Sequence, residues 1–157
     1  MHGCEKPIKK ADWLGLLTFG FFLLFFGIIW IATPNLKEQV KSFFTLENWQ
    51  LTEAAGKIVF PEPKHNYPIL YTAAMQFCLI FGVFHVFILA LRIFFHEPMD
   101  KIGGTVSGIV FWLSISFFFN ILANKTIGWF GFLAGLIISV GLSIIISNII
   151  KLVKFNP

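Results

Sequence analysis

Charged side chains are scarce in this chain, since Asp, Glu, Lys and Arg make up only 13% of its 157 residues. A soluble domain carries about 25% charged residues and is less apolar than the 57% found here. This composition excludes an ordinary soluble globule, a disordered tail and a nucleic-acid-binding arm. The presence of only two cysteines also excludes a disulfide framework and a Cys-rich metal module.

Four long runs contain no Asp, Glu, Lys or Arg, namely residues 13–32, 68–91, 103–123 and 127–150. Each run reaches the roughly 20 mostly apolar residues that a helix needs to cross a hydrocarbon core. Every charge lies in a terminus or between two runs. We therefore predict an all-α membrane protein with four transmembrane helices, in which residues 1–157 form a single polytopic domain.

The first run follows three basic residues, Lys6, Lys9 and Lys10, as the core of a signal peptide does. Its apolar stretch is longer than such a core, however, and residues 31–34 do not form a cleavage site of the A-x-A type. We therefore expect an uncleaved signal anchor.

The distribution of lysine and arginine favours cytoplasmic N- and C-termini. Seven of these residues lie in the two termini and the second loop, whereas five lie in the first and third loops. The net charge of +4 is spread over every loop and forms no basic stripe, so we expect no nucleic-acid partner. Lipid headgroups account better for these charges, and we expect a multi-pass protein whose immediate partner is the lipid bilayer.

The connection over residues 33–67 is too long for a simple turn. Apolar residues recur in it at helical spacing with polar residues between them, which predicts a short amphipathic helix in the headgroup plane. These residues are Leu36, Val40, Phe43 and Phe44. Trp49 is placed to anchor the loop at the interface, residues 57–60 have an extended pattern, and Pro61-Glu62-Pro63 predicts a stiff polyproline-like stretch. The loop either docks a partner or lies back on the bilayer.

Small and polar residues recur every four positions along the third and fourth runs. The third run carries Gly104, Gly108, Trp112, Ser116, Asn120 and Asn124, which we call the 104–124 row. The fourth run carries Gly131, Gly135, Ser139, Ser143 and Ser147, which we call the 131–147 row. In lipid, such rows mark the close approach of two helix backbones. If the chain folds back near Lys125, Gly108 lies opposite Ser143 and Ser116 opposite Gly135. We therefore predict a close-packed hairpin of the third and fourth helices.

His85 lies well inside the second run, and an ionisable residue at that depth is a candidate for function. No acidic side chain lies in any run to stabilise an imidazolium, so we expect a neutral ring. Ser107 and Ser143 lie at a similar depth, and we expect a hydrogen bond from one of them to the imidazole. Gln76 and Asn120 complete the set of polar candidates inside the spans. Structural, proton-carrying and ligand-binding roles stay open for His85, as does metal or haem ligation.

The segment from His96 to Asp100 contains a His-Glu pair but lacks the second histidine of a zinc-binding H-E-x-x-H helix. Pro98 also interrupts any helix there. We therefore interpret this segment as a solvated turn in which Glu97 and Asp100 lie in water.

The chain also lacks the C-x-x-C pair of membrane thiol oxidoreductases and a glutamate inside a span, on which small proton-coupled exporters depend. We therefore predict no catalytic residue, no cofactor and no metal. The leading hypothesis is a non-catalytic accessory, assembly or scaffold subunit that binds other membrane subunits or a second copy of itself. The alternative is a small oligomeric channel or transporter that uses a polar path around His85.

Overall fold

The computed structural model describes residues 13–54, 56 and 58–153. Their elements, in chain order, are α1 (Trp13–Ala32), α2 (Leu36–Phe44), η1 (Leu46–Asn48), β1 (Trp49–Ala54), β2 (Ile58–Pro63), α3 (Pro68–Phe94), α4 (Met99–Ala123) and α5 (Trp129–Val153). Among them α1, α3, α4 and α5 are long and apolar enough to cross a membrane, as the uncharged runs predict. Lys6, Lys9, Lys10, Lys57 and Lys154, which entered the charge count, lie outside the described residues.

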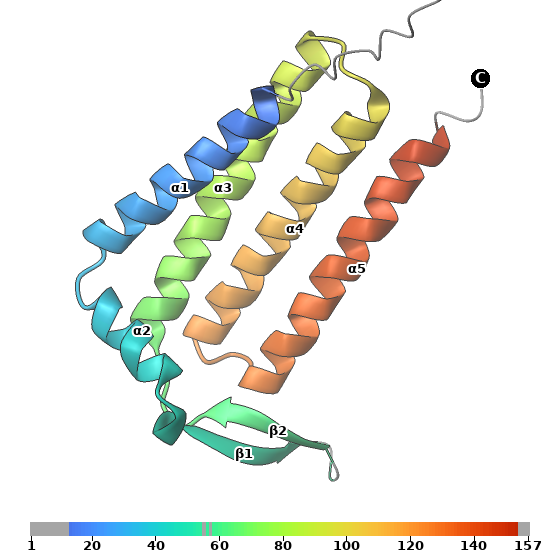
Figure 1. Cartoon of the computed structure of the whole chain (residues 1–157). Helices are drawn as coiled ribbons and strands as arrows, with labels where there is room; N and C mark the ends of the chain where they lie inside the picture. The colour runs from blue at the N-terminus through green and yellow to red at the C-terminus, as the bar shows by residue number, and fades with distance from the viewer. Residues whose placement is uncertain (1–12, 55, 57, 154–157) are drawn as a thin grey trace, which may run out of the picture.

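The four long helices lie side by side in the order α1, α3, α4, α5, so that α4 lies between α3 and α5 (Figure 1). The start of α1 lies beside the end of α3, where the Trp13 and Phe95 rings meet edge to face at 5.6 Å. At the opposite end, α2, η1 and the two strands lie below the starts of α3 and α5 (Figure 1). The extramembrane elements are therefore gathered at one end of the bundle.

The loop between α3 and α4 and the loop between α4 and α5 begin with the same helix-ending geometry. His96 and Lys125 have left-handed φ angles of 51° and 58°. In each case the next residue, Glu97 or Thr126, donates its N–H to a carbonyl five residues back, as in a Schellman motif. Because Pro98 then caps α4, this helix, the third of the predicted spans, begins at Met99, four residues before its predicted start.

The first loop contains a strand that the sequence analysis did not predict. Strands β1 and β2 pair antiparallel from Trp49↔Pro63 to Ala54↔Ile58, with Gly56 at a φ of 80° in the turn. Pro61-Glu62-Pro63 is therefore the end of a strand, and the predicted polyproline-like stretch is wrong. Lys64 N donates to Asn48 O at 2.8 Å, and the antiparallel alternation then points the backbone N of residues 61 and 63 away from β1. Proline is tolerated at such outward positions.

The 131–147 row of α5 faces α4. The Ser143 and Ser107 hydroxyls lie 2.6 Å apart, and the ring of Phe118 occupies the space where a Cβ on Gly135 would lie. Ser139 is fully buried and donates to Gly135 O at 2.8 Å. These contacts join the two helices along most of their length.

The middle of the 104–124 row, Gly108, Trp112 and Ser116, faces α3, and not α5 as predicted. Gly104, Asn120 and Asn124 are exposed. A Cβ on Gly108 would lie 3.1 Å from His85 Cδ2, and Ser116 Oγ donates to Met75 O at 3.0 Å. The pairing of Gly108 with Ser143 and of Ser116 with Gly135 is therefore wrong. A tight turn fixes which residues share a depth, but it leaves the rotation of each helix about its axis undetermined. Because α4 lies between two helices, it has two interfaces, and its neighbouring face with Ser107 and Phe118 packs on α5.

Candidate functional site

The His85 side chain lies at the close approach of α3 and α4 and is half-buried. Its Nδ1 lies 2.9 Å from Phe81 O of the same helix, and its ring meets the Phe81 ring edge to face at 4.5 Å. The expected hydrogen bond to a serine is wrong, because Ser107 and Ser143 bond to each other across α4 and α5. The imidazole is held instead between its own helix and the space left by Gly108.

The other polar candidates are not brought together around His85. Gln76 and Asn120 are exposed on the outside of the bundle, and Asn120 Oδ1 accepts a hydrogen bond from Asn124 at 2.8 Å. Ser107 and Ser143 are the two members of the predicted set in direct contact with each other among the described residues. The structure therefore divides the predicted polar set among four separate places.

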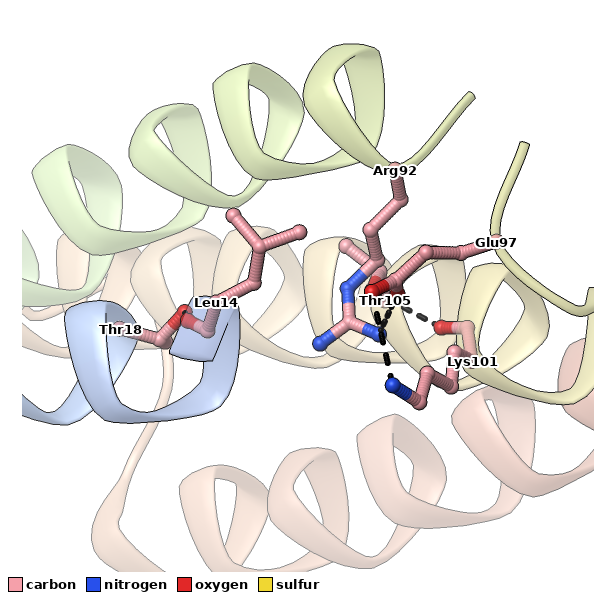
Figure 2. A network of polar contacts seen from close by, with 6 residues as sticks. All are labelled: Leu14, Thr18, Arg92, Glu97, Lys101 and Thr105. Carbon is pink, nitrogen blue, oxygen red and sulfur yellow. Dashed lines mark hydrogen bonds and ion pairs between the residues drawn. The ribbon is translucent and has the colours of Figure 1, made fainter. Parts of the chain in front are cut away.

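A polar cluster that the sequence analysis missed joins the end of α3 to the start of α4 (Figure 2). The Arg92 guanidinium lies 2.8 Å from one oxygen of Glu97, and the Lys101 ammonium lies 3.4 Å from the other. The side chains of Arg92 and Glu97 are only 9% and 14% exposed. The expectation that Glu97 lies in water is therefore wrong, whereas Asp100 is exposed.

This charged cluster is covered on one side by α1. Figure 2 shows Leu14 next to Arg92, and Leu14 is fully buried although most of α1 is exposed. Thr105 extends the cluster along α4 by donating to Lys101 O at 3.0 Å. Since both Glu97 oxygens are engaged by cations, the arrangement is suited to holding three helix ends together and offers no free base.

At the opposite end, aromatic rings fasten the first loop to the bundle. Phe43 of α2, Trp49 of β1 and Trp129 of α5 lie within 5.0–5.8 Å of one another, measured between ring centroids. Trp49 Nε1 donates to Phe43 O, and Tyr71 of α3 lies 6.3 Å from Trp129. We call Phe43, Trp49, Tyr71 and Trp129 the aromatic cluster. Phe43 and Trp49 were predicted as interfacial residues, whereas nothing in the local pattern of α5 pointed to Trp129 as their partner.

The hairpin projects beyond the aromatic cluster. Phe60 rests on Phe130 of α5 with the ring centroids 5.2 Å apart, so β2 is the strand next to the bundle. Several apolar side chains on this loop remain exposed: Phe44, Leu46, Leu51 and Val59. The described residues contain no group of three or more His, Cys, Asp or Glu side chains placed to hold a metal ion.

Four apolar helices long enough to cross a bilayer, with extramembrane structure at one end, are compatible with a multi-pass membrane protein. Compared with known proteins, the chain matches no family model, no curated protein and no solved structure.

Proposed function

We propose that this protein is a non-catalytic membrane subunit, an accessory, assembly or scaffold component that docks a partner protein on its folded first loop. The observation that carries the proposal is the hairpin of β1 and β2, which is fastened to the helix ends at its base and has one open edge. A docking element needs both properties, since a rigid base lowers the entropy lost when the partner binds.

The open edge belongs to β1. In the alternation set by the Lys64–Asn48 hydrogen bond, Trp49, Leu51 and Glu53 direct their backbone N–H and C=O groups away from β2. The Trp49 N–H is taken by Leu46 O of η1. Among the described residues, the outward groups of Leu51 and Glu53 take part in no further backbone hydrogen bond. An extended segment of another protein can pair with such an edge.

The other edge of the hairpin is less suited to pairing. Pro61 and Pro63 stand where β2 would offer outward N–H donors, and proline has none. In addition, β2 lies next to α5, whereas β1 beyond Trp49, whose ring contacts Trp129, lies on the side away from it (Figure 1). A partner strand is therefore expected to add to β1.

The side chains beside the open edge are apolar. Leu51 is 76% exposed and Val59 is 55% exposed, and their places in the register put both on one face of the hairpin. Leu46, just before β1, is 88% exposed. Exposed apolar groups that adjoin one another are typical of interaction surfaces, so an added strand with apolar residues on this face would cover them.

The same proposal assigns positions in the membrane to the rest of the chain. Leu36 of α2 is buried while Lys37, Glu38 and Lys41 are exposed, which suits a helix lying in the headgroup plane. The hairpin of α4 and α5 then spans the bilayer beside α3. Cytoplasmic termini place the docking edge on the opposite side of the membrane.

A channel or transporter is supported less well by the same structure. The buried serines are engaged in the packing of the helices, with Ser116 bonded to Met75 O and Ser139 to Gly135 O. Gln76 and Asn120 lie on the outer surface, so a polar path would have to be assembled between several copies.

Purification in mild detergent, followed by mass spectrometry of co-eluting proteins, tests the docking proposal. Leu51→Pro removes an outward N–H from the open edge and is expected to lower the recovered partner roughly tenfold, the equivalent of about one hydrogen bond. Val59→Pro is the matched control. The Val59 N–H also points outward, but from the edge of β2, which already carries Pro61 and Pro63, so this variant is expected to retain the partner. A strictly monomeric wild-type particle, or equal loss in both variants, would contradict the proposal.

A further inference from the structure

Two cavities flank Ala73 of α3 at the end of the bundle that α2 covers. The first has a volume of about 290 Å³ and is lined only by apolar and aromatic side chains from four helices. Its walls include Phe26, Trp30, Val40, Ala74, Phe77 and Trp112. Water gains no hydrogen bond in such a space, and at membrane depth a hydrocarbon chain is the available occupant.

The second cavity, about 440 Å³ in volume, has a polar side. It lies between the end of α1 and the start of α3 and is lined in part by Thr33, Thr72 and Gln76. Among the described residues the Gln76 amide has no hydrogen-bond partner. Gln76 lies eight residues beyond Pro68, the start of α3, which is about 12 Å along the helix axis. Because α3 has 27 residues and is about 40 Å long, Gln76 lies inside a hydrocarbon core of about 30 Å and below the ester carbonyls of a phospholipid, so this cavity does not hold the headgroup.

Positive charge lies next to the apolar cavity. Leu36 and Val40 of α2 line it, and each is followed directly by an exposed lysine, Lys37 and Lys41. The two lysines are four residues apart and therefore share one side of α2. The two lysines would attract an anionic phosphate headgroup more strongly than a neutral or zwitterionic headgroup.

We propose that the apolar cavity at Ala73 binds one anionic phospholipid. An acyl chain occupies this cavity, and Lys37 and Lys41 attract the phosphate. The inference is independent of the docking edge on β1, because it concerns a different part of the molecule and a different ligand.

Lipid retention by the purified full-length chain tests this inference. The protein is stripped of lipid in detergent, supplied with phosphatidylglycerol, phosphatidylcholine or diacylglycerol, and analysed by native mass spectrometry. We expect one phosphatidylglycerol per protein, with clearly weaker retention of the other two lipids. Replacing both lysines, as Lys37→Gln with Lys41→Gln, is expected to weaken phosphatidylglycerol retention about 25-fold, or about fivefold for each charge. Lys125→Gln, at an exposed position in the turn between α4 and α5, is the control and should change nothing.

The apolar cavity itself is tested on α3. Ala73→Phe places a phenyl ring in the wall of the apolar cavity and should abolish retention, whereas Ala90→Phe places the same side chain at an exposed position of the same helix and should preserve it. Equal retention of all three lipids would overturn the proposal, since it would show that the cavity accepts any hydrocarbon chain whatever its headgroup. An unchanged affinity after loss of both lysines would overturn it as well, even if Ala73→Phe failed to fold.

Discussion

Polar side chains in the bundle form hydrogen bonds and ion pairs with near neighbours that residue type alone does not predict. Glu97 follows a helix end and precedes a proline, a context typical of a solvated turn, yet it lies between Arg92 and Lys101 and is mostly buried. The sequence places these three residues within ten positions, but their meeting depends on the left-handed conformation of His96, which turns the chain back towards α4. Such backbone geometry at a non-glycine residue is not predictable from the local pattern.

His85 gives a prediction at the scale of one residue. Its hydrogen-bond partner is Phe81 O in its own helix, and the serines it was expected to bond are already paired with each other. His85→Leu and His85→Phe should therefore both cost only about 0.5–1 kcal/mol of stability, a value typical of one hydrogen bond within a membrane. Unfolding of the purified variants in detergent measures this cost.

The recovery of the partner in the same preparations provides the second measurement for His85. Since the side chain lies far from the β1 edge, at the contact with Gly108, both variants should bind the partner as the wild-type protein does. Loss of partner binding or of an ion flux in both variants, with stability retained, would assign His85 a functional role.

At the scale of elements, the sequence predicts the long helices well and their rotation poorly. Uncharged runs determine which segments can cross a membrane, because a charge inside a span is costly. The short turn also determines which residues of α4 and α5 lie at the same depth in the bundle. Ser107 and Ser143, which the sequence places at a similar depth, are in direct contact. The face of α4 that meets α5 does not follow, because small residues lie on two neighbouring faces. Strand β1 was missed because its six residues form a strand only through pairing with β2.

Matched glycines of α5 test the helix packing. Gly135→Leu inserts a side chain where the Phe118 ring of α4 lies, and should cost about 1–3 kcal/mol through overpacking. Gly141→Leu makes the same change in the same helix at a position with no described neighbour within 4 Å of the added Cβ, and should be nearly neutral. Thermal unfolding in detergent compares the two variants. Equal melting temperatures would show that the contact of Gly135 with Phe118 is misplaced.

At the scale of the whole molecule, the described chain begins and ends at the same end of the bundle, with Trp13 and Val153 opposite the hairpin (Figure 1). Four helices that all cross a membrane require this arrangement, since an even number of crossings returns the chain to its starting side. In such a multi-pass protein, the first-loop residues of the aromatic cluster lie across the membrane from Trp13 and Val153.

Two variants, each with one added cysteine, test this topology in intact cells. Glu53→Cys on β1 should react with a membrane-impermeant maleimide added outside, whereas Lys151→Cys near the end of α5 should react only after the membrane is opened. Both positions are exposed, and Cys78 is buried; Cys4→Ser removes the other thiol. The reverse labelling pattern would show that the termini face outwards, and equal labelling of both would contradict a single orientation.

The two prolines of β2 also limit stoichiometry. A hairpin with two open edges could accept strands on both sides and stack copy upon copy into a fibre. Here the β2 edge lacks donors at Pro61 and Pro63, so the sheet can grow from β1 alone. One hairpin can then bind a single strand, and once that strand is in place no equivalent edge of the hairpin is left for another. A complex built on this loop should accordingly contain one partner strand for each copy of the chain, whatever the excess of partner supplied.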